Sequence, residues 1–230
     1  MPTFISFRRN ILLPAVLCFS LNLALGQHRQ KTHDSHPERV IFDSDMGPDY
    51  DDVGAITLLH AFADAGRIKI LATIASTRYE NVAAVLNVLN TYFRRPDIPV
   101  AVPHQNGLTL RDWQHWTDTL VAKYPHRIGS NEEVPDAVAL YRKLLSASPD
   151  SSITIITVGF LTNLAGLLQS GPDQYSSLTG YDLVKRKIKK LVSMGGKFPS
   201  GSEFNINRDS AAAIYTYAHW PTPVWFSGFE

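Results

Sequence analysis

Residues 40–56, VIFDSDMGPDYDDVGAI, gather acidic side chains immediately after a short apolar run. Within ten positions they include five aspartates, namely Asp43, Asp45, Asp49, Asp51 and Asp52. Carboxylates at contact distance repel one another, and a buried carboxylate without a partner is unfavourable. Hard cations take several oxygen ligands within a small volume, and Ca²⁺ tolerates irregular geometry better than Mg²⁺. The cluster therefore predicts a divalent-cation site.

A simpler interpretation of the aspartates, helix capping, explains only part of the pattern. Asp51 and Asp52 open a helix-like segment, where each carboxylate gains about 0.3–1 kcal/mol from the helix dipole. Asp43 and Asp45, in contrast, follow the apolar residues 40–42 directly and need another partner. The spacing and the missing distal glutamate do not fit an EF-hand loop.

The N-terminal region has the features of a secretory signal. Arg8 and Arg9 precede an apolar run that Pro14 interrupts, and residues 24–26 supply small side chains for cleavage. We therefore expect a signal peptide at residues 1–26, a polar linker at residues 27–38, and one domain at residues 39–230. The protein is then secreted or periplasmic.

The charge balance limits the expected partners, and the cysteine content limits the expected chemistry. Removal of residues 1–26 leaves 204 residues with 20 basic and 21 acidic side chains. This balance predicts neither a nucleic-acid partner nor, once the signal is cleaved, a membrane surface. The only cysteine, Cys18, lies within the expected signal, so we expect no disulfide and no thiol chemistry in the exported domain.

Short apolar runs alternate with longer helix-like segments along residues 39–230. Strands are predicted at residues 40–42, 68–75, 99–102, 153–158, 189–194 and 223–226. Helices are predicted at about residues 51–65, 81–93, 134–146, 162–168 and 209–219. This alternation predicts an α/β fold, with an open, mostly parallel, Rossmann-like sheet and helices on both faces.

Sites in open parallel sheets lie beyond the carboxyl ends of the strands. Four predicted loops should therefore face one rim, at residues 43–52, 76–80, 158–160 and 194–196. The segment of residues 104–133 is rich in aromatic side chains and weak in periodicity. We expect it to be a packing loop or a lid over that rim.

The segment DSDMGPDYDDVGAI at residues 43–56 resembles the N-terminal signature of the nucleoside hydrolase family, the inosine-uridine-preferring nucleoside N-ribohydrolases. That signature is usually written DxDPGxDDAxA, and two residues are added here before the final acidic pair. The resemblance continues, in the family's order, at residues 157–167 (TVGFLTNLAGL), 192–198 (VSMGGKF) and 202–213 (SEFNINRDSAAA). It covers essentially all of residues 39–230 and implies the family's α/β fold, its activity on ribonucleosides and its Ca²⁺ cofactor.

The resemblance also implies roles for the residues around the ion. Asp45 matches the general base, which also contacts the calcium. Asp52 matches a chelating carboxylate, and Val158 stands where the family uses a backbone carbonyl as a ligand. Asp43 matches a supporting acid, whereas Asp49 belongs to the inserted pair and has no assigned role.

Four residues correspond to positions that contact the substrate. Asp51 matches an aspartate that binds the ribose hydroxyls, and Glu203 and Asn205 match further ribose-binding positions. Met194 corresponds to a substrate-contacting methionine. The partner implied is a small ribonucleoside, and a homo-oligomer is compatible with the family.

The sequence departs from the family pattern in two places. An ungapped comparison puts Tyr79 where the family offers an asparagine to the ribose, with Asn81 two residues later. The family also continues beyond the position of Glu230 and supplies a late aspartate to the calcium and a histidine to the leaving base. His219 closes a helix and is a poor substitute. We therefore expect an incomplete fold at the C-terminus, weak calcium affinity and little turnover for this chain alone.

Two other functions remain open at this stage. A non-catalytic remnant that binds a metal or a riboside is one. A haloacid-dehalogenase-type phosphatase is the other, because an apolar strand followed by DxD also opens that family, with Asp43 as nucleophile and Asp45 as acid. That family needs a later lysine and a second acidic pair; Lys189 and Lys190 precede the MGG turn, and no acidic pair follows it.

Overall fold

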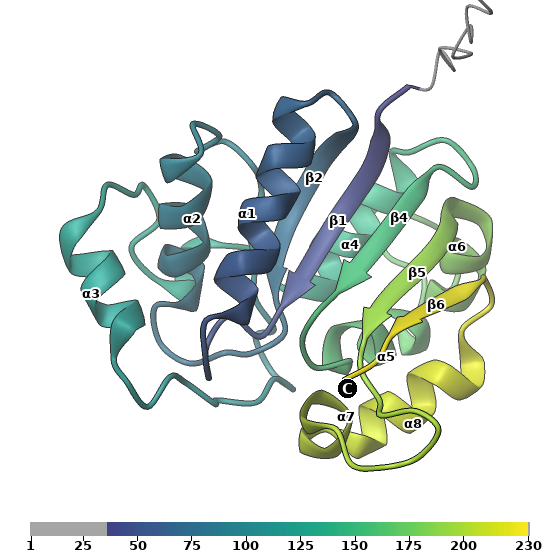
Figure 1. The fold of residues 1–230 in the computed structure, drawn as a ribbon. Helices are drawn as coiled ribbons and strands as arrows, with labels where there is room; N and C mark the ends of the chain where they lie inside the picture. The colour runs from purple at the N-terminus through teal and green to yellow at the C-terminus, as the bar shows by residue number, and fades with distance from the viewer. Residues whose placement is uncertain (1–35, 230) are drawn as a thin grey trace, which may run out of the picture. The chain divides into compact units, whose positions relative to one another are not determined.

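A computed structural model describes residues 36–229, which form a six-stranded sheet with helices packed against it (Figure 1). The expected signal peptide and nearly all of the expected linker lie outside these residues, so their assignment and the predicted localisation stay predictions. Among the described residues, none of the helices combines the length and the apolar character needed to cross a bilayer.

The sheet has the strand order β3-β2-β1-β4-β5-β6, and every neighbouring pair is parallel. The chain moves outward from β1 to β3, returns to the other side of β1 with β4, and continues to β6. The strands are β1 (Glu38–Ser44), β2 (Ile68–Ala75), β3 (Val100–Ala101), β4 (Ile153–Thr157), β5 (Ile188–Met194) and β6 (Val224–Ser227). The reversal between β1 and β4 creates a crevice at their carboxyl ends, where ligands bind in such sheets.

Eight α-helices and one 3₁₀-helix connect the described strands. They are α1 (Asp51–Asp64), α2 (Val82–Tyr92), α3 (Trp116–Lys123), η1 (Asn131–Glu133), α4 (Ala137–Ser146), α5 (Thr162–Gln169), α6 (Gly180–Lys187), α7 (Phe204–Arg208) and α8 (Ser210–His219). Because parallel strands need crossover connections, these helices fall on the two faces of the sheet.

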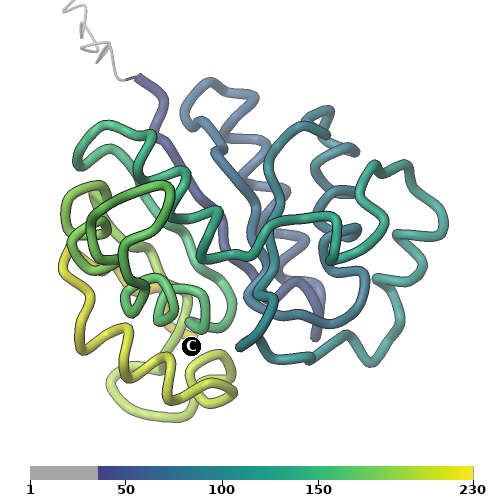
Figure 2. The backbone as a smooth tube through the Cα atoms, turned by 180° about the vertical axis from the view of Figure 1, so that it is seen from behind, coloured from purple at the N-terminus to yellow at the C-terminus, as the bar shows by residue number. Residues whose placement is uncertain are grey.

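Two hydrophobic cores lie on opposite faces of the sheet. Alternate residues of β1 enter different cores, with Ile41 in one and Val40 and Phe42 in the other. The first core joins the sheet to α4, α5, α6 and α8, which lie behind it in Figure 1 and in front in Figure 2. The second core joins the sheet to α1 and α2. Helices on both faces confirm the predicted architecture.

The face that carries α1 becomes less covered from β1 toward β6. Phe42, Ile156, Val192 and Trp225 are register partners across four strands. Phe42 is buried, Ile156 and Val192 are half-buried, and Trp225 is exposed with the Lys190 ammonium 4.2 Å from its ring centre. No described helix lies over β4–β6 on this side (Figure 1).

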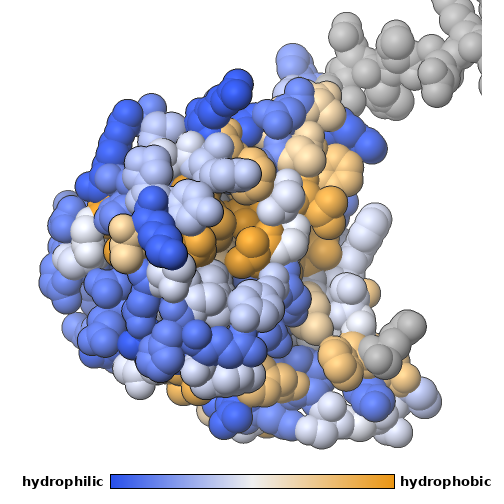
Figure 3. All heavy atoms as spheres, turned by 60° about the vertical axis from the view of Figure 1, so that its left-hand side comes forward, coloured by the Kyte–Doolittle hydropathy of each residue, from blue (hydrophilic) through white to orange (hydrophobic). Residues whose placement is uncertain are grey.

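The side that carries α1, α2 and α3 is mostly hydrophilic, with a hydrophobic band among the polar side chains (Figure 3). Leu58 and Phe62 on α1 are among the exposed apolar residues of the described chain. Single exposed apolar side chains are ordinary on a protein surface and need no special role.

Most predicted elements are confirmed, but three helices were not predicted. Helices α3, α6 and α7 are only five to eight residues long, about two turns or less, which is too short for a helical period to be recognised along the chain. Helix α4 begins at Ala137 and not at residue 134, because Asp136 caps it by accepting from the amides of Val138 and Ala139. Strand β1 begins at Glu38, which is the last residue of the linker predicted at residues 27–38.

Candidate active site

The first two acids of the cluster leave the carboxyl end of β1 into the interior of the protein. Asp43 is fully buried, and its Oδ2 accepts hydrogen bonds from the Tyr141 hydroxyl at 2.7 Å and from Asn163 Nδ2 at 3.1 Å. Burial raises the pKa of Asp43 to about 7, although both hydrogen bonds oppose the shift. Asp43 therefore supports the strand end from within and does not line the cleft described below.

Ser44 and Met46 turn the chain sharply after the strand. The Ser44 hydroxyl donates to Asp52 Oδ1 at 2.8 Å and accepts from the Met46 amide at 3.0 Å. Met46 has a positive φ of 31°, and its carbonyl accepts a 2.6 Å hydrogen bond from the Tyr79 hydroxyl. These contacts hold the turn that places Asp45 and Asp52 together.

Gly159 allows the loop after β4 to approach this turn. A Cβ at Gly159 would lie 2.3 Å from the Asp45 amide nitrogen and 2.5 Å from the Ser76 hydroxyl. The Ser76 hydroxyl also accepts from the Phe160 amide at 3.0 Å. The loops that follow β1, β2 and β4 therefore meet at one point, as the sequence predicted.

Asp45 and Asp52 form a buried carboxyl pair, close enough for each side chain to shift the pKa of the other. Burial raises the pKa of Asp45 to about 7; the contact with Asp52 opposes this shift, and the charges of Asp51 and Asp49 add to it. Burial, followed by repulsion from Asp45 and Asp51, holds the pKa of Asp52 well above its usual range. Two such groups are not both charged unless a cation lies between them; without a cation they share one proton.

Asp51 and Asp49 lie at the surface beside this pair. Asp51 opens α1, and its Oδ1 accepts from the Asp52 amide at 2.9 Å. Partial burial, reinforced by Asp49, raises the pKa of Asp51 to about 6. The helix start predicted at Asp51 is confirmed, and Asp51 and Asp52 both lie in the first turn of α1.

Glu203 and Asn205 approach the pair from the other side of the crevice. Glu203 caps α7: its oxygens accept from the amides of Asn205 at 2.9 Å, Ile206 at 3.1 Å and Gly196 at 3.2 Å. Asn205 Nδ2 donates to the Val158 carbonyl at 3.0 Å and lies 3.6 Å from Met194 Sδ. Four residues predicted from three separate motifs, namely Glu203, Asn205, Val158 and Met194, are thus brought into one group.

A cleft of about 280 Å³ connects the two groups. Its polar side chains are mostly the predicted ones, and aromatic side chains form much of the rest. Asp52 lies behind Asp45 and does not line the cleft, and the aromatic residues Phe204 and Phe229 were not predicted. The lining residues are Asp45, Pro48, Asp49, Asp51, Trp113, Val158, Met194, Glu203, Phe204, Asn205 and Phe229.

The aromatic segment of residues 104–133 contains two tryptophans, Trp113 and Trp116, and only one of them lines the cleft. Trp113 lines it, whereas Trp116 packs against Tyr50 with 5.7 Å between ring centres. The segment of residues 104–133 thus supplies a wall at one point and contains α3 and η1 elsewhere. The exposed indole of Trp113 had no signal in the sequence beyond its residue type.

Four further candidates are placed away from the cleft. Tyr79 is buried and bonded to Met46, and Asn81 precedes α2 without capping it through its side chain. His219 Nδ1 contacts the Tyr215 carbonyl at 2.8 Å at the end of α8, as expected for a helix-terminal residue. Lys189, needed for the phosphatase alternative, pairs with Glu38 at the amino ends of the strands.

The oxygen donors present are of the type that a hard cation requires. Asp45 and Asp52 are buried, in contact, and form no salt bridge to any described Lys or Arg. The Val158 carbonyl opens on the same cleft. Within residues 36–229, however, no three His, Cys, Asp or Glu side chains converge as a metal-binding group. The donor chemistry fits a divalent ion, with two carboxylates and one carbonyl.

A larger cleft of about 850 Å³ lies elsewhere, and Asn163, Asp209 and Tyr215 are among its lining residues. None of the five clustered aspartates lines it. The smaller cleft is therefore the better candidate for chemistry.

An open, doubly wound parallel sheet with a carboxylate-lined crevice at its switch point defines a class of α/β ligand-binding proteins and enzymes. Comparison with known families narrows this class. Residues 40–228 match the family model described as inosine-uridine preferring nucleoside hydrolase. The chain belongs to this family, which confirms the resemblance stated from its motifs.

Individual relatives agree with this assignment. The pyrimidine-specific ribonucleoside hydrolase RihA of Citrobacter koseri is 33% identical over 202 residues, which cover 83% of this chain and 60% of the relative. The RihA of Salmonella paratyphi B is 31% identical over the same coverage. The chain thus spans 60% of the length of these curated relatives.

A solved structure shares the fold at lower identity. The purine-preferring ribonucleoside hydrolase from Gardnerella vaginalis superposes with a TM-score of 0.62 at 19% identity, over 83% of this chain and 60% of that chain. At this identity the likeness shows the fold alone.

Proposed function

We propose that this protein hydrolyses the N-glycosidic bond of ribonucleosides to give ribose and a free base. The observation that carries the proposal is the placement of Asp45. Its buried carboxyl lines a cleft that polar groups of Asp51, Glu203 and Asn205 share with the indole of Trp113. A ribonucleoside has the same two halves, a polar sugar and a flat aromatic base.

Asp45, Asp52 and the Val158 carbonyl are the groups that would hold Ca²⁺. Their oxygens match the preference of this ion, and its charge would offset the repulsion within the buried carboxyl pair. When bound, such an ion supplies a Lewis acid that polarises the oxygen atoms it contacts.

Asp45 is the group that accepts a proton. A water oxygen forms a bond to the anomeric carbon, and the bond from that carbon to the base nitrogen breaks. The proton of the water passes to the Asp45 carboxylate, and the electron pair of the broken bond goes to the base nitrogen, which takes up a proton from the surrounding water. Asp45 then returns its proton to water, so that protons balance over the cycle. Positive charge develops on the sugar during this step, and nearby carboxylates stabilise it.

The other cleft residues orient the substrate. The Asp51 carboxylate at the mouth and the Asn205 amide can form hydrogen bonds with sugar hydroxyls. Both oxygens of Glu203 already accept from backbone amides, so its main contribution is to fix Asn205. Holding the sugar in one orientation lowers the entropic part of the barrier.

Substitution of Asp45 tests the proposal. We expect Asp45→Asn to lower turnover by about a hundredfold or more while the ribonucleoside still binds, because an amide cannot accept the proton. Turnover is measured as the release of free base, detected by chromatography, in reactions with Ca²⁺ and in reactions with a chelator. Binding of the ribonucleoside is measured by calorimetry. Asp97→Asn is a matched control, since that carboxylate is exposed and pairs only with Arg127 among the described residues. Unchanged turnover in Asp45→Asn would overturn the role of Asp45.

A second candidate is a protein that binds a metal or a riboside without turnover. Within the part of the chain that the structure describes, no third acidic side chain joins Asp45 and Asp52 to form a metal-binding group. This observation favours the second candidate. In that case the wild-type chain would bind the ribonucleoside and release no base at any Ca²⁺ concentration.

A further inference from the structure

Trp113 lies in a part of the chain where its position needs an explanation. Residues 102–115 contain no helix and no strand longer than an isolated bridge. The indole of Trp113 is 63% exposed, yet it lines the cleft beside Asp45. Neither burial nor regular secondary structure fixes it there. The residues on both sides of it must do so.

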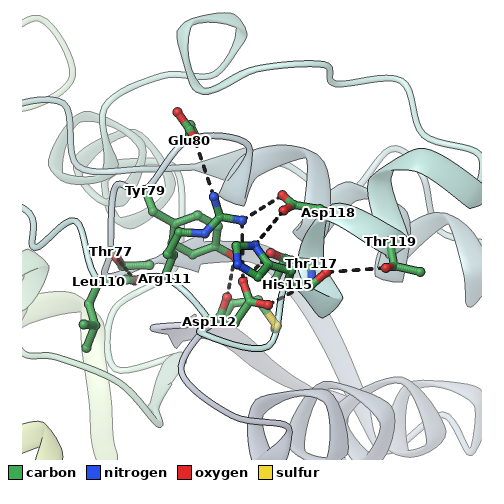
Figure 4. A network of polar contacts seen from close by, with 11 residues as sticks. Thr77, Tyr79, Glu80, Leu110, Arg111, Asp112, His115, Thr117, Asp118 and Thr119 are labelled. Atoms are coloured by element: carbon green, nitrogen blue, oxygen red, sulfur yellow. Dashed lines mark hydrogen bonds and ion pairs between the residues drawn. The ribbon is translucent and has the colours of Figure 1, made fainter.

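The residues before Trp113 are bound to the segment that follows β2 (Figure 4). The single proton of the Thr77 hydroxyl is shared between the Leu108 carbonyl at 2.9 Å and the Leu110 carbonyl at 3.0 Å. Thr77 and Leu110 are drawn in Figure 4. The Arg78 amide donates to the Leu108 carbonyl at 2.7 Å. Residues 108–110 are therefore attached to the sheet rim and not free to move with the loop.

Asp112, immediately before Trp113, closes a short turn. Its carboxyl is fully buried; Oδ1 accepts from the Thr117 hydroxyl at 2.5 Å, and Oδ2 accepts from the Thr117 amide at 3.4 Å. Thr117 itself is buried in the first turn of α3. The Asp112–Thr117 contact joins the two ends of the stretch that carries Trp113 (Figure 4).

Arg111 braces the same turn from outside. Its guanidinium lies 2.8 Å from Asp118, 3.4 Å from Glu80 and 3.9 Å from Asp112. Burying a carboxylate is unfavourable unless it is hydrogen-bonded and charge-compensated. An asparagine could not fully replace Asp112, because the carboxylate accepts from both the amide and the hydroxyl of Thr117. The side-chain nitrogen of asparagine would face one of these donors and could not accept from it.

The same network reaches the residue next to Asp45. Tyr79 lies between the Asp112 region and the aspartate turn, and its hydroxyl donates to the Met46 carbonyl at 2.6 Å (Figure 4). Asp45 precedes Met46 directly. Residues 77–79 thus hold both sides of the cleft: Thr77 and Arg78 bind the stretch before Trp113, and Tyr79 binds the residue after Asp45.

We propose that Asp112 is a positioning residue that holds the Trp113 indole as the wall of the cleft against which the nucleobase lies. This inference rests on the proposed function, because it assigns the base half of a ribonucleoside to the Trp113 side. The sugar half then faces Asp45, Asp51 and Asn205. Asp112 itself does not line the cleft and acts only through Trp113.

Binding measurements with a ribonucleoside and with free ribose separate the two halves. Stacking of a base on an aromatic side chain is worth about 5- to 150-fold in affinity. We expect Trp113→Ala to weaken binding of the ribonucleosides uridine and inosine by a factor in this range and to leave ribose binding unchanged. Trp113→Phe should retain most of the affinity. Trp225→Ala is the matched control, because that indole is 60% exposed and does not line the cleft.

A double-mutant cycle tests the role of Asp112. Asp112→Asn should weaken ribonucleoside binding by about tenfold and leave ribose binding unchanged, since it leaves a buried donor unpaired and releases the turn. The double variant Asp112→Asn/Trp113→Ala should bind no more weakly than Trp113→Ala, because Asp112 acts through the indole. If Asp112→Asn does not fold, Thr117→Val removes the hydroxyl donor with little change of shape and replaces it in the cycle.

Each outcome decides between the proposals. Equal weakening of ribonucleoside and ribose binding by Asp112→Asn, or additive effects in the cycle, would show a general structural role and overturn this inference. Unchanged ribonucleoside affinity in Trp113→Ala would also overturn it and leave the proposed function standing. A wild-type chain that binds neither ribose nor ribonucleoside would remove the proposed function and this inference together.

Discussion

Gly159 is the residue at which the loops of the candidate site come closest together. Its missing side chain lets the loop after β4 pass against the backbone of residues 44 and 45. The φ of Gly159 is not among the positive ones, so a left-handed backbone conformation is not the reason for a glycine here. The requirement is close approach of two backbones and not conformational freedom.

Replacement of Gly159 should therefore destabilise the protein strongly. The Cβ of Gly159→Ala would lie 2.9 Å from the Ser44 carbonyl carbon as well as 2.3 Å from the Asp45 nitrogen, and neither backbone atom can rotate away. We expect a loss of about 3 kcal/mol in the free energy of unfolding, measured by urea denaturation. Gly171→Ala is the control, because nothing lies within 4 Å of the position that its methyl group would take. Equal stability of the two variants would contradict the explanation.

At the scale of elements, α7 is too short to be stable without its cap. The helix has five residues, and Glu203 satisfies two of its free amides together with the amide of Gly196. This arrangement fastens the turn after β5 to the helix start and carries Asn205 into the cleft. A lone short helix of this kind depends on capping and tertiary contacts more than on propensity.

Glu203→Gln tests this dependence. The amide group keeps one acceptor oxygen and places an N–H group against a backbone donor. We expect a loss of about 1–2 kcal/mol in the free energy of unfolding, since a lost cap costs about that much. Thermal and urea unfolding measure it, and Glu132→Gln, at an exposed position, should leave stability unchanged. A stability equal to wild type would mean that the cap contributes little.

At the scale of the whole domain, a buried polar chain ties the helices of one face to the sheet. His60 on α1 contacts Asn90 Oδ1 on α2 at 3.1 Å, and Asn90 Nδ2 donates to the Thr73 hydroxyl on β2 at 2.8 Å. Because Asn90 Oδ1 only accepts, His60 Nε2 is the donor. The Arg95 guanidinium faces His60 Nδ1 at 3.4 Å, so a neutral ring suits both contacts.

The neutral ring of His60 predicts a loss of stability in acid. Burial lowers the pKa of His60 from 6.5 to about 4; Arg95 adds to this shift, and the contact with Asn90 and the charge of Asp64 oppose it. The imidazole of His60 is therefore protonated below about pH 6.5 in the unfolded chain, but only below about pH 4 in the folded protein. Stability from this group is complete above pH 6.5 and falls as the pH drops toward 4, by about 2 kcal/mol.

Comparison of wild type with His60→Gln isolates this contribution. Buried carboxyls with raised pKa values, such as Asp43, act in the opposite direction over an overlapping range, so the wild-type curve alone is not diagnostic. The difference in unfolding free energy between the two proteins, measured by urea denaturation from pH 7.5 to 4, should shrink by about 2 kcal/mol as the pH falls. A difference independent of pH would show that His60 is not the titrating group.

Much of the fold was predictable because its signals are local. Apolar runs of strand type and helix periods indicated six strands and five helices with bounds close to the observed ones. The missed helices α3, α6 and α7 are short and mostly polar, and their capping and tertiary contacts decide their existence. The strand expected at residues 99–102 has only two residues, because it borders the sheet and pairs on one side alone.

Residue types and their order determined the chemistry of this protein: a cluster of aspartates after the first strand, and ordered motifs that belong to the nucleoside hydrolase family. Only the tertiary structure decided how those residues meet. It separated buried Asp45 and Asp52 from exposed Asp49 and Asp51, and it chose Trp113 over Trp116 as a wall of the cleft. The physical reason is that burial, pKa and contact depend on packing between segments far apart in the chain, and no local pattern records that packing.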